Sequence, residues 1–462
     1  MEGDPPSYVW AAEDAARVQQ RRSALSHAIW ALAWPVIVSL LLQSLVSLID
    51  VLMVGRLGAA AVAAVGIGAQ ILSAVGVVMA AVGTGTLALV ARYVGAQQPH
   101  EAEDVLGQSI TAAFGLSLVV IAPVLAFAMP LVQLFGVAPP VVVQGTLYVR
   151  LVMAAIPQAA VLFVIGSALR GAGDTRTPLI IGAVVNLINV VADYVLIFGK
   201  LGFPALGVAG SALGTTIAFT TGTGVGLVWL ASGRLRLHLT SHHFPPQWRI
   251  IRRLLTIGYP VAAEQVLMQV GFFLYLTFAA RYGTSAVAAY VIGVRILALS
   301  FLPGFGFGAA AAALVGQNLG AGKPDLAERS GWESNRLAMY LMTTCGVVLF
   351  IAARPIATLF VADASVVIDA VSFIRILAAA QPLMALDFTL GGALRGAGDT
   401  RFPLVAMLIG FYGCRLTFAY LAAALLHLSL TWLWFALMGD YLARAALKAW
   451  RFQSGSWKHI AV

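Results

Sequence analysis

We single out four carboxylates that stand inside long apolar stretches of this 462-residue sequence, where a charged side chain is costly. A charge at the centre of a bilayer costs on the order of 2.5–3.5 kcal/mol on insertion scales, so such residues commonly have a functional role. We expect each acid to form an ion pair, to face water or to bind a ligand. The four are Asp50, Asp193, Glu264 and Asp387.

The two halves of the sequence give these acids different surroundings. The second half places Arg295 and Arg415 in apolar stretches, each one stretch beyond an acid, so structural ion pairs with Glu264 and Asp387 are one interpretation. The first half has no basic residue in such a position. Its two acids must therefore be neutralised by protons, by a bound metal cation or by a cationic substrate.

Polar residues at helical spacing accompany both first-half acids. Asn186, Asn189 and Asp193 recur at i, i+3 and i+7, and a second series that ends at Asp50 contains Ser39, Gln43 and Ser47. Each series occupies one face of a helix. Oxygen-rich faces of this kind suit a proton or a hard cation. The alternative interpretation is a satisfied polar network that only packs the helices together.

The composition requires lipid around most of the chain. Hydrophobic residues make up 60% of the sequence and charged residues 10%, against about 25% charged in soluble domains. Twelve apolar stretches of roughly 20 residues are long enough to cross a hydrocarbon core of ~30 Å as helices. They cover approximately 29–50, 60–84, 105–128, 147–169, 179–198, 207–231, 255–279, 286–308, 337–353, 371–394, 403–426 and 428–447.

An internal repeat organises these stretches. Residues 168–179 return with one change as residues 393–404, and further matches hold the same offset without a gap. Each repeat contains six stretches, an even number, so both repeats enter the membrane in the same sense. We therefore predict an all-α integral membrane protein of twelve transmembrane helices, built as two six-helix repeats about a pseudo-two-fold axis along the membrane normal.

The buried charges do not follow the repeat. At the same offset, Asp50 becomes Tyr275 and Asp193 becomes Phe418, while Glu264 corresponds to Ser39. Asn189 likewise becomes Cys414, and Asp387 corresponds to Leu162. The two halves thus share a scaffold and are expected to differ in their chemical task.

The distribution of basic residues predicts the topology. Most of the 28 Lys and Arg residues fall on the side that holds the N-terminus, so both termini are expected in the cytoplasm and the protein in the inner membrane. The net charge of +9 is then a topology signal, and no nucleic-acid partner is expected. The expected segments are a cytoplasmic lead 1–27, an N-lobe 28–231, a linker 232–249, a C-lobe 250–450 and a tail 451–462.

Glycine and proline mark positions where the chain turns or bends. Pro35 removes a helix hydrogen bond in the first stretch and is a candidate hinge, and residues 303–308 are expected to interrupt the eighth stretch. The repeated Arg-Gly-Ala-Gly-Asp-Thr segments, here called the elbows (170–175 and 395–400), are expected to be cytoplasmic turns with local pairs of Arg170 with Asp174 and Arg395 with Asp399.

The sequence resembles the MATE (multidrug and toxic compound extrusion) family. The resemblance is carried by Pro35, by residues 50–58 and 314–321, and by both elbows, and it extends from about residue 28 to residue 450. It implies secondary antiport, in which inward flow of H⁺ or Na⁺ drives the export of organic, often cationic and aromatic, compounds.

The resemblance also implies roles for individual residues. The first-half set is similar to the DinF-like branch of the family, in which such residues bind the coupling ion. That set consists of Asp50, Asn189 and Asp193, to which we add Asn186 from the polar series and Thr215, with Ser211 as an alternative to Thr215. The family's asparagine on the fourth span has no clear match, because that span offers only Gln158 and Ser167.

The second half supplies a further candidate site and a candidate substrate path. Glu264 resembles the family's acid on the seventh span, and with Gln265 and Asp387 it is a possible second-lobe cation or substrate site. Side chains of the seventh span that can contact a drug through soft or cation–π contacts are Met268, Phe272 and Tyr275, with lipid-facing packing as the alternative for each. Gln43 is a further candidate for the substrate path.

The sequence therefore predicts a multidrug efflux antiporter that acts on small organic molecules within membrane lipid, as a monomer and without a cofactor other than H⁺ or Na⁺. The alternative within the same superfamily is a flippase for lipid-linked oligosaccharides. A flippase cleft should be strongly cationic, whereas the expected buried charges are four acids and two bases. An integral membrane enzyme lacks support, because no clustered catalytic or metal motif is present.

Overall fold

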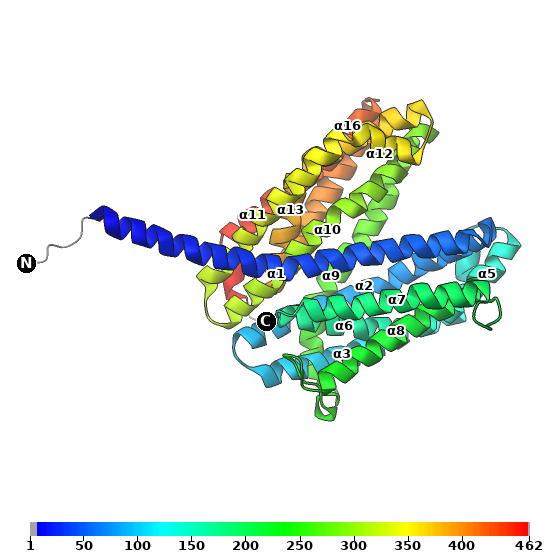
Figure 1. Ribbon diagram of the computed structural model, residues 1–462. Helices are drawn as coiled ribbons and strands as arrows, with labels where there is room; N and C mark the ends of the chain where they lie inside the picture. Colours follow the sequence, from blue (N-terminus) through cyan, green and yellow to red (C-terminus); the bar gives the residue numbers. More distant parts are fainter. Residues whose placement is uncertain (1–6, 461–462) are drawn as a thin grey trace, which may run out of the picture.

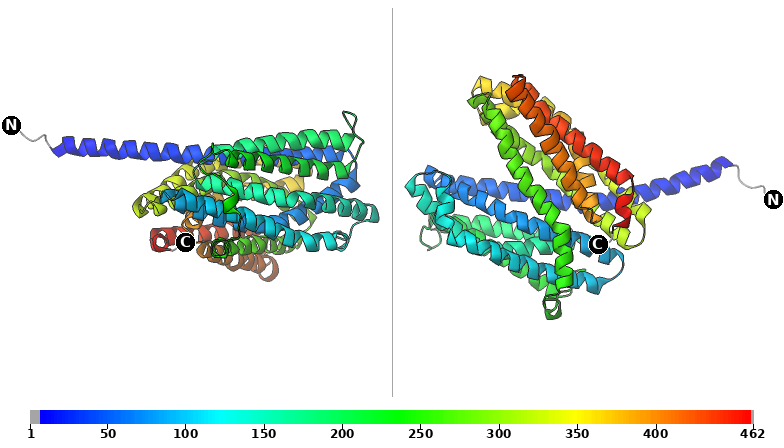
Figure 2. Two further views of the ribbon diagram at one scale, coloured as in Figure 1. Left: turned by 90° about the horizontal axis from the view of Figure 1, so that it is seen from below. Right: turned by 180° about the vertical axis from the view of Figure 1, so that it is seen from behind.

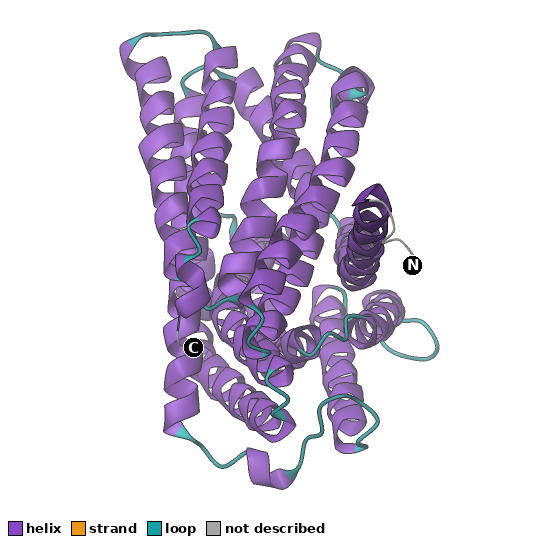
Figure 3. Cartoon of the chain, turned by 90° about the vertical axis from the view of Figure 1, so that its left-hand side faces the viewer, coloured by secondary structure: helices purple, strands orange, loops and turns teal. Residues whose placement is uncertain are grey.

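The structure is a computed structural model that describes residues 7–460, with side chains from residue 23, and all its regular structure within that range is helical (Figure 3). Eleven of its helical segments are long and apolar enough to cross a membrane. The twelfth long helix, α16, has 24 residues but carries Asp440, Arg444 and Lys448. The predicted all-α fold with two six-helix repeats is confirmed.

The first repeat contains α1 (Ser7–Gly55), α2 (Ala59–Gly95), α3 (Pro99–Ala126), α4 (Ala128–Gln133), α5 (Pro139–Val152), η1 (Met153–Ala155), α6 (Ile156–Gly171), α7 (Arg176–Phe198) and α8 (Val208–Ala231). A connector holds η2 (Ser241–His243). The second repeat contains α9 (Trp248–Ala280), α10 (Thr284–Gly320), α11 (Pro324–Ile351), α12 (Ala353–Phe360), α13 (Ala364–Gly396), α14 (Arg401–Met407), η3 (Leu408–Leu416), α15 (Thr417–Tyr420), η4 (Leu421–Leu425) and α16 (Leu430–Gln453), before η5 (Ser456–His459).

Helix boundaries repeat with the sequence offset. Helix α2 and helix α10 have the same length and begin and end at equivalent residues, as do α3 and α11. We call α2–α8, with the part of α1 after Pro35, the N bundle, and α10–α16, with the part of α9 after Pro260, the C bundle. Figure 1 shows the two bundles diverging from the end of the molecule that holds the C-terminus, and the view from behind in Figure 2 shows the same arrangement.

Helices α1 and α9 connect the two bundles. The first half of α1 packs on α10, where Gly306 lies against the backbone of Ala33, and its second half runs beside α7. Helix α9 repeats this arrangement, since Gly258 lies against the backbone of Ala81 on α2. The two contacts are equivalent, because Gly306 corresponds to Ala81 and Ala33 corresponds to Gly258 at the repeat offset. Glycine at each crossing lets the two backbones touch, because a side chain there would overlap the neighbouring helix.

The bundles meet most closely at the C-terminal ends of α2 and α10. Gly95 lies against the backbone of Gln317, and Gly320 lies against that of Arg92, so any side chain at either glycine would overlap the opposite helix. Gln317 Nε2 donates to Gly171 O at 2.7 Å, and Arg92 Nη2 donates to the carbonyl of Ala397 at 3.1 Å. We call this region the closed end.

Pro35 lies buried in α1 next to the crossing with α10. Because proline has no N–H, the carbonyl of Ala31 loses its helix partner. The hydroxyl of Thr175, at the elbow before α7, donates to that carbonyl at 3.4 Å. The elbow therefore contacts the candidate hinge directly.

The expected interruption of the eighth apolar stretch is wrong. Helix α10 is continuous from Thr284 to Gly320 and holds Pro303 in its interior, with Gly304 and Gly308 placed against Phe388. Small residues let the helix pack closely enough to stay intact at that point.

The elbows also differ from the expected local ion pairs. Asp174 accepts hydrogen bonds from the backbone N–H and hydroxyl of Thr177, at the start of α7. Arg170 donates to Ser167 Oγ at 3.0 Å. In the second elbow, Asp399 pairs with Arg451, and Arg395 pairs with a residue of another helix. Within a tight turn of this kind the backbone N–H groups satisfy the aspartate, which frees the arginine for distant contacts.

Replacing Thr175 with valine should lower the free energy of unfolding by about 1 kcal/mol, because the Ala31 carbonyl loses its donor. The same replacement in a Pro35→Ala background should cost much less, since the new backbone N–H satisfies that carbonyl. Thermal unfolding of the four proteins in detergent measures this double-mutant cycle. Equal losses in both backgrounds would show that Thr175 does not serve the proline site.

Candidate functional site

A polar cluster lies between α7 and α8 inside the N bundle. Asp193 is fully buried, and Asn189, one turn earlier on α7, donates from Nδ2 to Asp193 Oδ1 at 3.4 Å. Asn189 Nδ2 also lies 3.5 Å from Thr215 Oγ1 on α8. Three residues singled out in the sequence are thus brought together. Asp193 Oδ2 remains buried without a hydrogen-bond partner.

Asp50 approaches this cluster from α1. It is partly buried, its Oδ1 has no hydrogen-bond partner, and it lies within electrostatic range of Asp193. In the part of the chain whose side chains are described, no Lys, Arg or His nitrogen lies within 4.0 Å of either carboxylate. Two like charges in range of each other favour a shared proton or cation between them.

Two further residues lie near Asp193, namely Tyr148 and Ser211, and only Ser211 was a candidate from the sequence. The buried ring of Tyr148 on α5 lies within electrostatic range of Asp193 and Asp50. Ser211, the alternative to Thr215, is buried beside Asp193 and Tyr148. A tyrosine at the start of an apolar stretch commonly marks the membrane interface, so its position in the sequence gave no sign of this contact.

Gly214 on α8 sets the distance between α7 and α8. A methyl group at Gly214 would overlap Asp193 Oδ1, and one at Gly210 would overlap the backbone of Leu196. The two glycines stand four residues apart, so they form one small-residue face along α8. This face lets the carboxylate lie directly against the α8 backbone.

A cleft of about 600 Å³ lies between the bundles, separate from the polar cluster. Residues of α1, α2, α6 and α7 line one side, and residues of α9, α10, α13 and α16 line the other. Asn186 lines this cleft, as do Gln43 and Ser39, whereas Asp50, Asn189 and Asp193 do not. The structure thus places Asn186 at the cleft and not among the hydrogen-bond partners of Asp193, so its part in ion binding stays a prediction.

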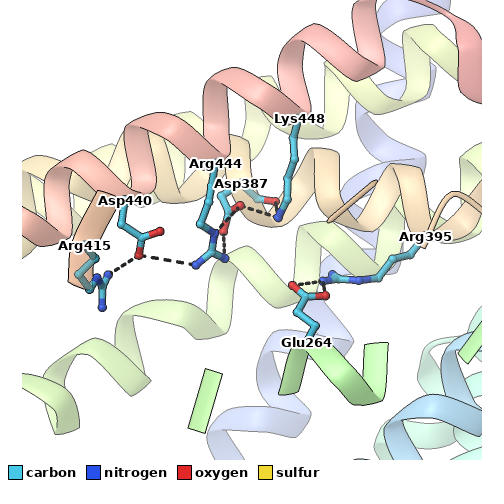
Figure 4. A network of polar contacts seen from close by, with 7 residues as sticks. All are labelled: Glu264, Asp387, Arg395, Arg415, Asp440, Arg444 and Lys448. Atoms are coloured by element: carbon cyan, nitrogen blue, oxygen red, sulfur yellow. Dashed lines mark hydrogen bonds and ion pairs between the residues drawn. The ribbon is translucent and has the colours of Figure 1, made fainter. Parts of the chain in front are cut away.

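The C bundle neutralises its acids with its own bases, as Figure 4 shows. Arg395 donates to both oxygens of Glu264, at 2.9 and 2.7 Å. Asp387 pairs with Arg444, and Lys448 Nζ lies 2.5 Å from Asp387 Oδ1.

The network continues to Asp440 on α16. Arg415 Nη2, from η3, lies 2.7 Å from Asp440 Oδ2, and Arg444 Nη1 lies 3.9 Å from the same oxygen. The structure therefore contains the ion pairs anticipated for this half, with other partners. Arg295 does not pair with Glu264, and it is exposed on α10. Arg415 pairs with Asp440 in place of Asp387.

The expected surplus of buried acid is also wrong for the cleft. Its lining contains two acids and four bases, namely Glu264, Asp387, Arg170, Arg395, Arg444 and Lys448. The positive-inside pattern assigns all four bases to the cytoplasmic side of the membrane. Arg444 and Lys448 are instead buried within the C bundle.

Three of the four residues predicted for the substrate path line the cleft. Gln43, Met268 and Phe272 line the cleft, together with Gln265 beside Glu264. Tyr275 does not: it is 1% exposed, its hydroxyl donates to Leu433 O at 2.6 Å, and its ring packs against Trp434. The Tyr275 side chain, about one helical turn after Phe272, thus lies in the core of the C bundle.

Comparison with known proteins gives consistent matches over nearly the whole chain. The MatE family model matches residues 35–195 and 260–421, two segments that start at equivalent positions of the repeat. The "Probable multidrug resistance protein NorM" of Thermotoga maritima is 29% identical over 437 residues, which cover 93% of each chain. The "Multidrug resistance protein NorM" of Burkholderia vietnamiensis is 30% identical over 428 residues, 91% of this chain and 92% of that one.

A solved structure from Pyrococcus furiosus has a similar fold, with a TM-score of 0.87 at 23% identity over 95% of this chain and 97% of that chain. That protein is described with the words "Reverse polarity of binding pocket suggests different function of a MOP superfamily transporter". At this identity the similarity concerns the fold alone.

Gly214→Ala should lower the free energy of unfolding by about 1–3 kcal/mol, because the new methyl group displaces Asp193. It should also reduce the shift in melting temperature produced by H⁺ or Na⁺. Gly224→Ala, on the same helix with no atom within 4 Å of the new methyl group, is the control. Equal behaviour of the two variants would exclude the proposed close contact.

Asp387→Asn should lower the free energy of unfolding by about 3–5 kcal/mol, because it leaves Arg444 and Lys448 buried without their main anion. Asp369→Asn, on the same helix outside the network, should change little. Thermal unfolding in detergent compares the two. A loss for Asp387→Asn no larger than that for the control would contradict a structural role for these ion pairs.

Proposed function

The chain belongs to the MatE family of membrane transporters, and we propose that it works as an antiporter in which inward flow of H⁺ or Na⁺ drives export. Multidrug efflux is the function that the family and the names of its relatives support. Proteins of this family transport their substrates and do not convert them, so we propose no enzymatic activity. The flippase alternative is not favoured by these relatives.

The unpaired acids of the N bundle carry the proposal for the coupling site. Asp50 and Asp193 have no cationic neighbour among the described side chains, and each has a buried oxygen without a hydrogen-bond partner. Burial without a counter-charge is unfavourable for a carboxylate, so a proton or Na⁺ is expected to bind there. Asn189, Thr215 and Ser211 add the neutral oxygens that a hard cation accepts.

The C-bundle acids suit a different role. Glu264 and Asp387 are held by three bases, so binding a cation there requires breaking ion pairs. We propose that they shape the wall of the cleft, with Gln265 beside them, and that the coupling ion is bound in the N bundle.

The proposed orientation places the closed end at the cytoplasmic face of the inner membrane, with both termini inside. The elbows and the C-terminal segment lie at that end, where Arg92 Nη2 donates to the carbonyl of Ile460 at 3.1 Å. The bundles separate toward the opposite end (Figure 1), which makes this arrangement outward-open. The expected N-lobe 28–231 and C-lobe 250–450 would then move relative to each other about α1 and α9.

To drive transport, ion binding must favour either this outward-open arrangement or the opposite one, in which the cleft opens to the cytoplasm. Asp50 stands on α1 beyond Pro35, and Asp193 stands on α7 beyond the elbow that contacts Ala31. Neutralising the two acids lets the second half of α1 approach α7. We propose that this movement bends α1 at Pro35 and changes the shape of the cleft, which Gln43 and Ser39 line from the same helix.

Asp50→Asn and Asp193→Asn should each lower gradient-driven export of ethidium by about tenfold or more, because an amide neither takes up a proton nor attracts a cation. The measurement is ethidium transport in proteoliposomes with an imposed Na⁺ or pH gradient. Glu101→Gln, exposed at the start of α3, is the control and should retain transport.

Retention of both export and its gradient dependence by the two asparagine variants would contradict the coupling site. A response to only one of the two gradients in the wild-type protein identifies the coupling ion. Absence of wild-type ethidium export together with absence of export of other aromatic compounds would contradict the efflux function itself.

A further inference from the structure

We infer that the cleft accepts aromatic compounds that carry a carboxylate, and that Arg170 binds this carboxylate. This inference rests on the proposed export function and specifies its substrate class. It differs from the cationic preference that the family resemblance implies. Its basis is one arginine in the cleft that the protein itself leaves without an acid.

Arg170 lies in the last turn of α6 and lines the cleft from the N bundle. It donates one hydrogen bond, from Nη2 to Ser167 Oγ at 3.0 Å, and its guanidinium carbon lies 6.0 Å from the centre of the Phe163 ring. No carboxylate lies within 4.0 Å of it among the described side chains. A guanidinium offers five N–H donors, so most of its capacity remains for a ligand.

The internal repeat shows what this arginine lacks. Its equivalent in the second half is Arg395, whose guanidinium donates to both carboxylate oxygens of Glu264. The residue equivalent to Glu264 in the first half is Ser39. Ser39 also lines the cleft, but its hydroxyl donates to Pro35 O at 2.8 Å, and its side chain carries no charge.

The first half therefore contains the base of this ion pair but not the acid. A carboxylate on a substrate can occupy the place that the Glu264 carboxylate occupies in the second half. Planar, bidentate binding of a carboxylate is the geometry that arginine favours.

The total charge of the cleft leads to the same conclusion. Both of its acids are already paired with cleft bases, and the four bases exceed the two acids by two positive charges. A surplus of buried positive charge favours an anionic group on the ligand. Seven phenylalanines also line the cleft, among them Phe163 and Phe272, and their rings suit an aromatic body.

The test uses two dyes that differ in one group. Rhodamine 110 carries a free carboxylate, and rhodamine 123 is the methyl ester of the same fluorophore. Binding to the purified full-length protein in detergent is measured by fluorescence anisotropy, and export is measured in proteoliposomes. Wild-type protein should bind and export rhodamine 110, and Arg170→Gln should weaken rhodamine 110 binding about 10-fold or more while rhodamine 123 changes less than about 2-fold.

A second substitution tests the same position without removing the arginine. Ser39→Glu restores the acid found in the second half, and it should displace the substrate carboxylate, so rhodamine 110 binding falls about 10-fold or more relative to Ser39→Gln. The glutamine variant has the same size and no charge. Rhodamine 123 binding should be equal in the two variants or stronger with glutamate.

Two control variants separate this effect from misfolding. Arg170→Lys keeps the charge and should retain part of the preference for rhodamine 110, whereas Arg176→Gln changes an exposed arginine of the next helix outside the cleft and should behave as wild type. Monodispersity on size-exclusion chromatography reports folding for every variant.

Equal losses of both dyes in Arg170→Gln, together with equal rhodamine 110 binding by Ser39→Glu and Ser39→Gln, would overturn the inference. Wild-type export of rhodamine 123 or ethidium without binding of rhodamine 110 would also overturn it, while leaving the efflux function intact. Absence of export of all three compounds would instead contradict the proposed function.

Discussion

A carboxylate inside a membrane-spanning bundle must be neutralised, and the two bundles of this protein do so in different ways. The C bundle supplies its own bases, so that Glu264 and Asp387 lie in ion pairs within the structure. The N bundle supplies none to Asp50 and Asp193, whose unpaired oxygens are buried among neutral polar groups. The same scaffold thus contains one half whose acids are paired with its own bases and one whose acids, in our proposal, are neutralised by an ion from outside.

The repeated backbone contacts join the two bundles at equivalent positions. Helices α1 and α9 cross between the bundles at glycine contacts related by the sequence offset, such as those of Gly306 and Gly258. Small residues at these crossings let the helix backbones approach closely. Pro35 and the elbow threonine Thr175 add a point of weaker helix hydrogen bonding at the crossing of α1.

The sequence predicted the architecture and part of the site. The repeat and the apolar stretches determine the helices, and helical spacing places Asn189 and Asp193 on one face. Long-range partners were out of reach, because Glu264 pairs with a residue 131 positions away and Asp387 with one 57 positions away. Tyr148 was missed because a tyrosine near a membrane interface is ordinary, and Arg170 because basic residues at helix ends usually mark topology.

The central claim is that the acids of the N bundle bind the coupling ion, and infrared difference spectroscopy of the purified protein tests it most directly. The spectra report the carboxylic-acid and carboxylate stretches as pH is raised or Na⁺ is added. We expect the wild-type protein to show a change in these bands, and we expect Asp50→Asn and Asp193→Asn each to remove or reduce it. A wild-type response that persists unchanged in both variants would contradict this account.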